Sequence, residues 1–216
     1  MVAVSETPPP AKPSLWAQAL RAPEFTSLII LVIVLAAFAI GDSKFLSPLN
    51  VSNVIAFLPE LGIIALGMTL LLTAGEFDLS VGAVFALAPV SVMLLVQNAD
   101  FSLGAALLVG LAICIIVGAI NGFLVTKIGI SSFLVTLSML LIVRGAALYI
   151  TQGFPLKAWD RPGPLVTLLA GSFDWGPFRF YTSLWWFIAL TLLAIYILDY
   201  AKLGNWISAI GSNRSA

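Results

Sequence analysis

The residues of this chain that could do chemistry are few, and they stand between or within long apolar segments. Two carboxylates and a hydroxyl lie close together in Glu76-Phe77-Asp78-Leu79-Ser80, which separates two apolar segments. Asn121, Thr136 and Arg144 each lie inside a further apolar segment. Polar groups in such surroundings need hydrogen-bond partners, and intramembrane polar residues often mark solute pathways. Asp78, Ser80, Asn121, Thr136 and Arg144 are therefore candidates for a polar pathway or for the network that supports one.

Simpler explanations exist for several of these residues. Residue chemistry alone favours Asp78 or Ser80 as a cap that accepts from the free N–H groups of the following helix. For Asn121, a hydrogen bond to a neighbouring helix is as good an explanation as a pathway. Gly118 and Gly122 flank this region with a G-x-x-x-G spacing, which predicts close approach of another helix.

Arg144 has three interpretations that stay open at this stage. A guanidinium near the bilayer centre costs at least about 2.5–3.5 kcal/mol, so it cannot face lipid without cost. It could snorkel to an interface if its helix is displaced, pair with a buried acid such as Glu60 or Asp78, or contact a hydroxyl-rich solute.

Composition shows what kind of chain must position these residues. The 216 residues are 61% hydrophobic and 9% charged, far from the balance of a soluble domain. Long uncharged segments predict an all-α polytopic membrane protein with about six transmembrane helices. Their approximate limits are 25–41, 57–74, 80–97, 104–126, 131–151 and 183–200.

Several function classes are disfavoured by the same counts. The net charge is zero, so the chain has no electrostatic footprint for nucleic acid. It has no histidine and one cysteine, which excludes an intrachain disulfide and leaves no predicted metal site. No catalytic residues are predicted.

Flanking segments complete the predicted organisation. Residues 1–24 are expected to form a cytoplasmic tail and an interfacial segment, and 25–216 a transmembrane domain with an external loop at 152–183. Lysines and arginines in the short loops favour a cytoplasmic N-terminus. Before the second span, Val51–Phe57 is predicted to lie at the membrane interface, and Pro59 to begin the helix. Glu60 would then lie in the first turn of that helix, or alternatively its carboxylate would face a polar pathway. Aromatic residues of the external loop indicate an interfacial belt.

One sequence motif is more informative about function than the composition is. Ala65-Leu66-Gly67-Met68-Thr69, followed by Gly75-Glu76-Phe77-Asp78-Leu79-Ser80-Val81-Gly82, resembles the signature of permease subunits of ribose- and xylose-type ATP-binding-cassette (ABC) sugar importers. Further similar strings follow in the same order along the chain: Asn121-Gly122, Ser132-Phe133-Leu134-Val135-Thr136-Leu137, Arg144-Gly145 and Gly204-Asn205-Trp206-Ile207-Ser208-Ala209-Ile210-Gly211-Ser212-Asn213.

The resemblance implies a permease, not an enzyme, that translocates a monosaccharide or related polyol across a bacterial inner membrane. It implies a second permease subunit, identical or different, a cytoplasmic ATPase and a periplasmic solute-binding protein that docks on the external loop. Residues 202–216 would contact the ATPase, with Gly204, Gly211, Asn213 and Arg214 as coupling candidates. Similar permeases are longer, so the chain is expected to be truncated at its C-terminus.

Coupling to ATP would depend on that partner. No lysine lies in a G-x-x-x-x-G-K-[ST] context, so no cofactor is expected on this chain and ATP would be used by the partner subunit. Three other functions remain open. An ion-coupled secondary transporter or channel would use Glu60, Glu76, Asp78 and Arg144 and would work without ATP. An inactive permease fragment would only assemble or be degraded, and an intramembrane enzyme is the least favoured.

Overall fold

The structure is a computed structural model that describes residues 23–156 and 163–212. Its described elements, in chain order, are α2 (Pro23–Gly41), α3 (Pro48–Thr73), α4 (Val81–Asn98), α5 (Leu103–Phe123), the π-helix η1 (Leu124–Ile128), α6 (Ser132–Thr151), α7 (Pro164–Ala170), β1 (Ser172–Trp175), β2 (Phe178–Tyr181), α8 (Ser183–Asp199) and α9 (Lys202–Ser212). The chain divides into two compact units, residues 1–51 and 52–216, with the boundary near the start of α3.

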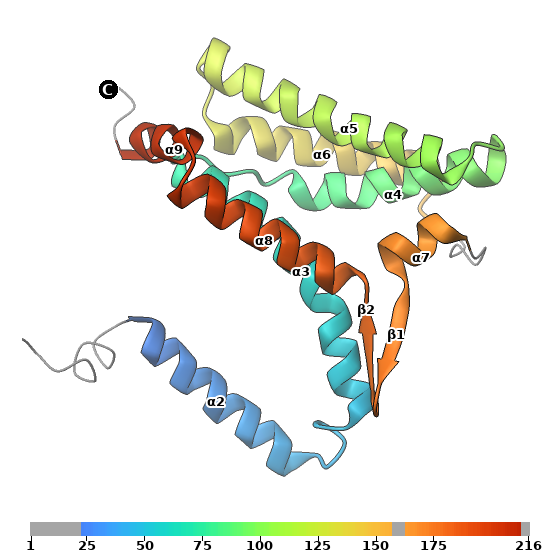
Figure 1. The fold of residues 1–216 in the computed structure, drawn as a ribbon. Coiled ribbons are helices and arrows are strands. Elements are labelled where there is room, and N and C mark those ends of the chain that lie inside the picture. Colours follow the sequence, from blue (N-terminus) through green and yellow to red (C-terminus); the bar gives the residue numbers. More distant parts are fainter. Residues whose placement is uncertain (1–22, 157–162, 213–216) are drawn as a thin grey trace, which may run out of the picture. The chain divides into compact units, whose positions relative to one another are not determined.

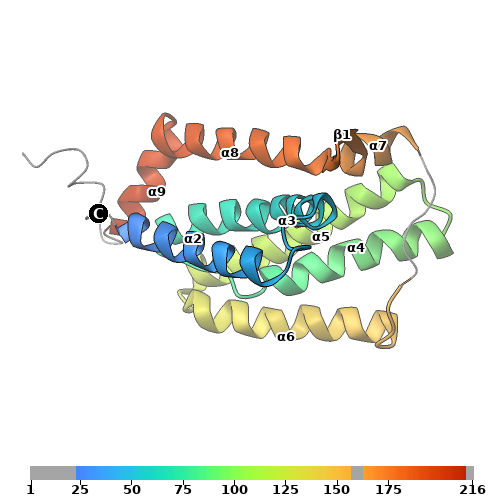
Figure 2. The same cartoon turned by 90° about the horizontal axis from the view of Figure 1, so that it is seen from below.

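Each of the six predicted apolar segments is helical, which confirms the all-α polytopic class. Four of these helices are long and apolar enough to cross a membrane: α3, α4, α5 continued by η1, and α6. The pair α8 and α9, bent by 70°, gives a fifth candidate (Figure 2). The predicted first span corresponds to α2, of which Ser27–Gly41 is a shorter apolar helix within the described residues.

The start of α3 differs from the sequence prediction. The helix begins at Pro48 and runs through Pro59, so the predicted helix start at Pro59 is wrong, and the interfacial position of Val51–Phe57 stays a prediction. Ser47 explains the earlier start, because its Oγ accepts from the Asn50 N–H at 3.4 Å and its carbonyl accepts from the Val51 N–H at 3.0 Å. Proline at the first helical position loses no hydrogen bond. Glu60 is consequently an exposed mid-helix residue and not part of a first turn.

Helices α4, α5 and α6 form a packed group in the second unit (Figure 1). Their buried core has two clusters. In one, Ala83 and Leu87 of α4 meet Val143 of α6, and in the other Val92 and Val96 of α4 meet Ala106 of α5. The small side chains of Ala83 and Ala106 leave room for the helices to approach closely at these two positions.

The glycine that packs α5 most closely is not one of the predicted pair. A Cβ atom at Gly118 or Gly122 would find no described atom within 4 Å, so the G-x-x-x-G packing prediction is wrong for the described residues. Gly110 is buried instead, and a Cβ there would lie 2.7 Å from Val92 Cγ2. The rotation of α5 about its own axis explains this difference. Gly110 lies on the face of α5 that meets α4, whereas Gly118 and Gly122 are exposed.

The predicted external loop contains ordered elements. After α7, strands β1 and β2 pair antiparallel, with Asp174 opposite Arg179 and Trp175 opposite Phe178. Gly176 has a φ of 60°, which fits the first central residue of a type II′ hairpin turn. The hairpin leads directly into α8.

Candidate functional site

A polar network centres on the segment between α3 and α4. The Asp78 Oδ1 atom accepts two hydrogen bonds of 2.6 Å, one from the Ser80 N–H and one from the Ser80 hydroxyl. This carboxylate bonds a residue ahead of α4, and the Ser80 side chain makes no capping bond to the helix. The predicted side-chain cap is therefore wrong, because Ser80 has helical backbone angles and its hydroxyl is engaged by Asp78.

Asn121 and Thr136 join this network from two other helices. The Asn121 Nδ2 of α5 donates to Ser80 Oγ at 3.1 Å and lies 3.5 Å from Asp78 Oδ2. Thr136 Oγ1 of α6 accepts from the Leu79 N–H at 3.1 Å and donates to the Ser132 carbonyl at 2.7 Å. Four of the five pathway candidates thus meet at one place, and their roles in transport stay predictions.

Three residues of the network are buried, and Asp78 is half-buried. Ser80 is 0%, Thr136 3% and Asn121 5% exposed. Thr136 stands four residues after the first residue of α6, and Asn121 seven residues before the end of η1, so both lie about 6–10 Å inside their helix ends. The Oδ1 atom of Asn121 is a buried acceptor that has no hydrogen-bond partner among the described residues.

Arg144 does not belong to this network. No ion pair joins it to an acid among the described residues, so the predicted pair with Glu60 or Asp78 is absent. Asp78 already accepts from Ser80 and Asn121, and Arg144 lies eight residues, or about 12 Å, beyond Thr136 along α6. Arg144 instead lines a cleft of about 730 Å³ between α4 and α6.

Helix α9 places two of the predicted coupling residues against other helix ends. Gly204 is buried where its backbone meets the Ile197 and Leu198 carbonyls of α8. A Cβ at Gly211 would collide with the Thr73 carbonyl at the end of α3. The same turn continues through Gly75 to Asp78, so α9 contacts the segment that carries the polar network. Asn213 and Arg214 lie outside the described residues.

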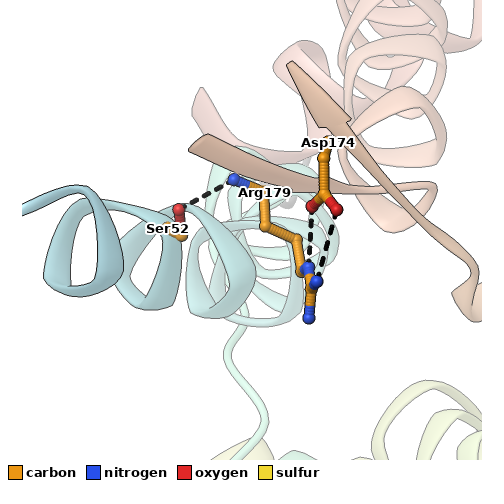
Figure 3. A network of polar contacts seen from close by, with 3 residues as sticks. All are labelled: Ser52, Asp174 and Arg179. Atoms are coloured by element: carbon orange, nitrogen blue, oxygen red, sulfur yellow. Dashed lines mark hydrogen bonds and ion pairs between the residues drawn. The ribbon is translucent and has the colours of Figure 1, made fainter. Parts of the chain in front are cut away.

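The external hairpin is tied to α3 by a contact that the sequence did not indicate (Figure 3). The Arg179 N–H donates to Ser52 Oγ at 2.9 Å, and the Arg179 guanidinium bonds both Asp174 oxygens, at 2.8 and 3.3 Å. The hydrogen bond from Arg179 holds the pKa of Asp174 below its ordinary value. Of the aromatic residues in this loop, Trp159 lies outside the described residues, and Trp175 is 74% exposed.

Comparison with known proteins finds one matching family model and several proteins of similar sequence. Residues 50–216 match the family model described as "Branched-chain amino acid transport system / permease component". The ribose import permease protein RbsC of Escherichia coli (strain K12) is 32% identical over 200 residues, which cover 89% of this chain and 59% of that protein. The xylose/arabinose import permease protein XylH of Sulfolobus acidocaldarius is 28% identical over 197 residues, 88% of this chain and 52% of that protein.

A third relative, the fructose import permease protein FruF of Bifidobacterium longum, is 32% identical over 155 residues, which cover 71% of this chain and 42% of that protein. The chain therefore spans roughly half the length of these relatives. No solved structure gives a significant match.

Proposed function

Because the chain belongs to the family of transport-system permease components, we propose that it is the membrane-spanning part of an ABC importer for a monosaccharide or related polyol. The named relatives import ribose, xylose or arabinose, and fructose. The observation that carries the proposal is the Asp78–Ser80–Asn121 network, in which Ser80 and Asn121 are buried and Asp78 is half-buried. Thr136 joins it by accepting from the Leu79 N–H. It sets hydroxyl, amide and carboxylate groups among helices that are otherwise apolar.

In the proposed mechanism the network holds α4, α5 and α6 in one of two arrangements. Solute hydroxyls compete for its hydrogen bonds, and the unpartnered Asn121 Oδ1 accepts from one of them. ATP binding and hydrolysis in a partner subunit bias the equilibrium between the two arrangements, which gives alternating access.

Partners follow from this assignment as part of the proposal. A cytoplasmic ATPase uses the ATP and contacts α9, whose contact with the turn at Thr73–Gly75 relays movement toward Asp78. A periplasmic solute-binding protein docks on the external loop, and a second permease subunit, identical or different, completes the pathway. The chain is a multi-pass protein of a bacterial inner membrane with a cytoplasmic N-terminus.

The test is solute uptake by membrane vesicles that contain the chain with its ATPase and binding protein. We expect uptake of a neutral pentose or hexose that requires ATP and that persists when ionophores collapse the ion gradients. The Asn121→Leu variant removes the donor to Ser80 and should reduce uptake at least tenfold at equal abundance. The matched control is Asn98→Leu, at the exposed end of α4.

Two results would contradict the proposal. Uptake that follows an ion gradient without ATP would identify a secondary transporter, and full-rate uptake by a normally assembled Asn121→Leu chain would remove Asn121 from the pathway.

A further inference from the structure

The cleft at Arg144 is a separate feature from the polar network. Its walls come from α4, α6 and the segment 153–156 that follows α6. They are made largely of small or apolar side chains, among them Ala83, Ala86, Val90, Leu140 and Ala147. Below it, the packed cluster of Ala83, Leu87 and Val143 fixes the two helices against each other. At about 730 Å³ the cleft lies within the usual range for small-molecule sites.

Arg144 is the only ionisable residue among the described residues that line this cleft. Its side chain is exposed and forms no ion pair with a described residue. A guanidinium presents five donors in a planar fork and stays charged at any physiological pH. Such a group between two membrane helices needs acceptor atoms, and lipid offers none at that depth.

Acceptor groups lie at the other end of the same cleft. Thr151 lines it seven residues, or about 10 Å, beyond Arg144, and α6 ends there because Gln152 and Gly153 have positive φ values of 53° and 77°. The last carbonyl groups of α6 already accept hydrogen bonds from Gln152, Gly153 and Phe154. The Thr151 hydroxyl donates to the Ala147 carbonyl at 2.9 Å, and its oxygen keeps lone pairs that can accept from a bound molecule.

This arrangement discriminates between classes of solute. Sugar hydroxyls both donate and accept, and a sugar ring also offers an apolar C–H surface to alanine and valine side chains. An anion would also be attracted by Arg144, but its charged group would lose hydration among the apolar side chains of the cleft. The cleft offers a neutral polyhydroxylated molecule both hydrogen bonds and apolar contact.

We propose that the α4–α6 cleft is a binding position for a neutral monosaccharide or polyol, with Arg144 donating to adjacent hydroxyls. It is a second polar position on the seam between α4 and α6, about 12 Å along α6 from Thr136. This inference rests on the proposed function for the identity of the solute. The binding position is tested without measuring transport, so that this inference and the proposed importer function can fail separately.

The experiment measures thiol accessibility in the full chain in native membranes. Cys114→Ser removes the single cysteine, and Ala147→Cys then places one thiol in the cleft. Ile142→Cys, on α6 outside the cleft and 65% exposed, is the matched control. Each chain is treated with a negatively charged sulfonatoethyl or a positively charged trimethylammonioethyl methanethiosulfonate, with and without D-ribose, D-xylose, D-fructose or D-gluconate.

We expect the thiol at position 147 to react faster than that at 142, and about tenfold faster with the negative reagent than with the positive one. Arg144→Gln should abolish this preference and Arg144→Lys should keep it. At least one neutral sugar should slow the reaction at position 147 in the Arg144 chain and fail to do so in the Arg144→Gln chain.

Three results would overturn the inference. Equal reactivity at positions 147 and 142 would mean that no aqueous cleft exists. A charge preference that survives Arg144→Gln would mean that Arg144 does not set it. Protection by D-gluconate alone, or by none of the four solutes, would refute a site for neutral sugars. None of these results depends on ATP or on a partner subunit, so failure of ATP-driven uptake would leave the labelling result intact.

Discussion

Ser52 and Arg179 lie 127 positions apart, and a 2.9 Å hydrogen bond from the Arg179 N–H to Ser52 Oγ joins them. Ser52 is only 6% exposed, so the bond is shielded from water. It fixes the start of β2 against α3, and thereby positions the hairpin that leads into α8.

Removing this bond should loosen the hairpin. Ser52→Ala leaves the Arg179 N–H without that acceptor, which costs about 1 kcal/mol. Hydrogen exchange at the Arg179 amide should accelerate about fivefold as a result. Ser172→Ala, at the exposed first residue of β1, is the control and should leave this exchange rate unchanged. An unchanged rate in Ser52→Ala would show that the contact does not hold the hairpin.

The ion pair across the hairpin should give a measurable titration shift. Because the Arg179 guanidinium donates to its carboxylate, the pKa of Asp174 lies below the ordinary value of 3.8. The contribution of the pair to hairpin stability is then complete above that ordinary value and is lost as the pH falls through the lowered pKa. Carbon-13 NMR of aspartate carboxyls should show the lowered midpoint, and Arg179→Gln should raise it.

This titration has a second check. Both side chains are exposed, by 56% and 62%, so 1 M salt should also move the midpoint upward. A midpoint that is the same in the Arg179→Gln chain would mean that the pair does not form in solution.

Thr136 offers a test of the polar network that keeps side-chain shape nearly constant. Thr136→Val removes the acceptor of the Leu79 N–H in a site that is 3% exposed, which should cost about 1–3 kcal/mol. The midpoint of thermal unfolding in detergent should fall by about 2–4 °C for each kcal/mol lost. Thr136→Ser retains the hydroxyl and should unfold at a higher temperature than Thr136→Val. Equal midpoints for valine and serine would contradict the role assigned to this hydrogen bond.

Gly211 tests the contact between α9 and the end of α3. Gly211→Ala places a methyl group against the Thr73 carbonyl, a backbone atom that cannot rotate away, and overpacking of this kind costs about 1–3 kcal/mol. Amide exchange over Lys202–Ile210 should therefore increase.

The control for this substitution lies in α3. A Cβ at Gly67 would find no described atom within 4 Å, so Gly67→Ala should be neutral or slightly stabilising. If Gly211→Ala leaves exchange in α9 as slow as Gly67→Ala does, then α9 is not packed closely on the turn at Thr73.

The helices can be predicted from the sequence more securely than their ends or their partners. The start of α3 lies at Pro48 and not at Pro59, and Ser47-Pro48, an N-cap followed by proline, is the sequence signal for it. The hairpin also has a recognisable sequence signal, Gly176-Pro177 between two aromatic runs.

For the candidate polar residues, too, the sequence indicated one property and left another open. Their positions within or beside apolar segments already implied that Asp78, Ser80, Asn121 and Thr136 need partners, since unpaired polar groups are costly there. Residue spacing could not say which of them would meet. Arg144 was grouped with them and proved to lie about two turns away, facing a cleft of its own.

Hydropathy and charge along the chain therefore determined by themselves that this protein is an all-α membrane protein, because transfer into lipid is a sum of local contributions that needs no knowledge of neighbours. Only the tertiary structure decided that Asn121 bonds Ser80, that Gly110 and not Gly118 packs against α4, and that Ser52 holds Arg179. Such pairings depend on how each helix is rotated and aligned against the next, and contacts between residues distant in sequence set both.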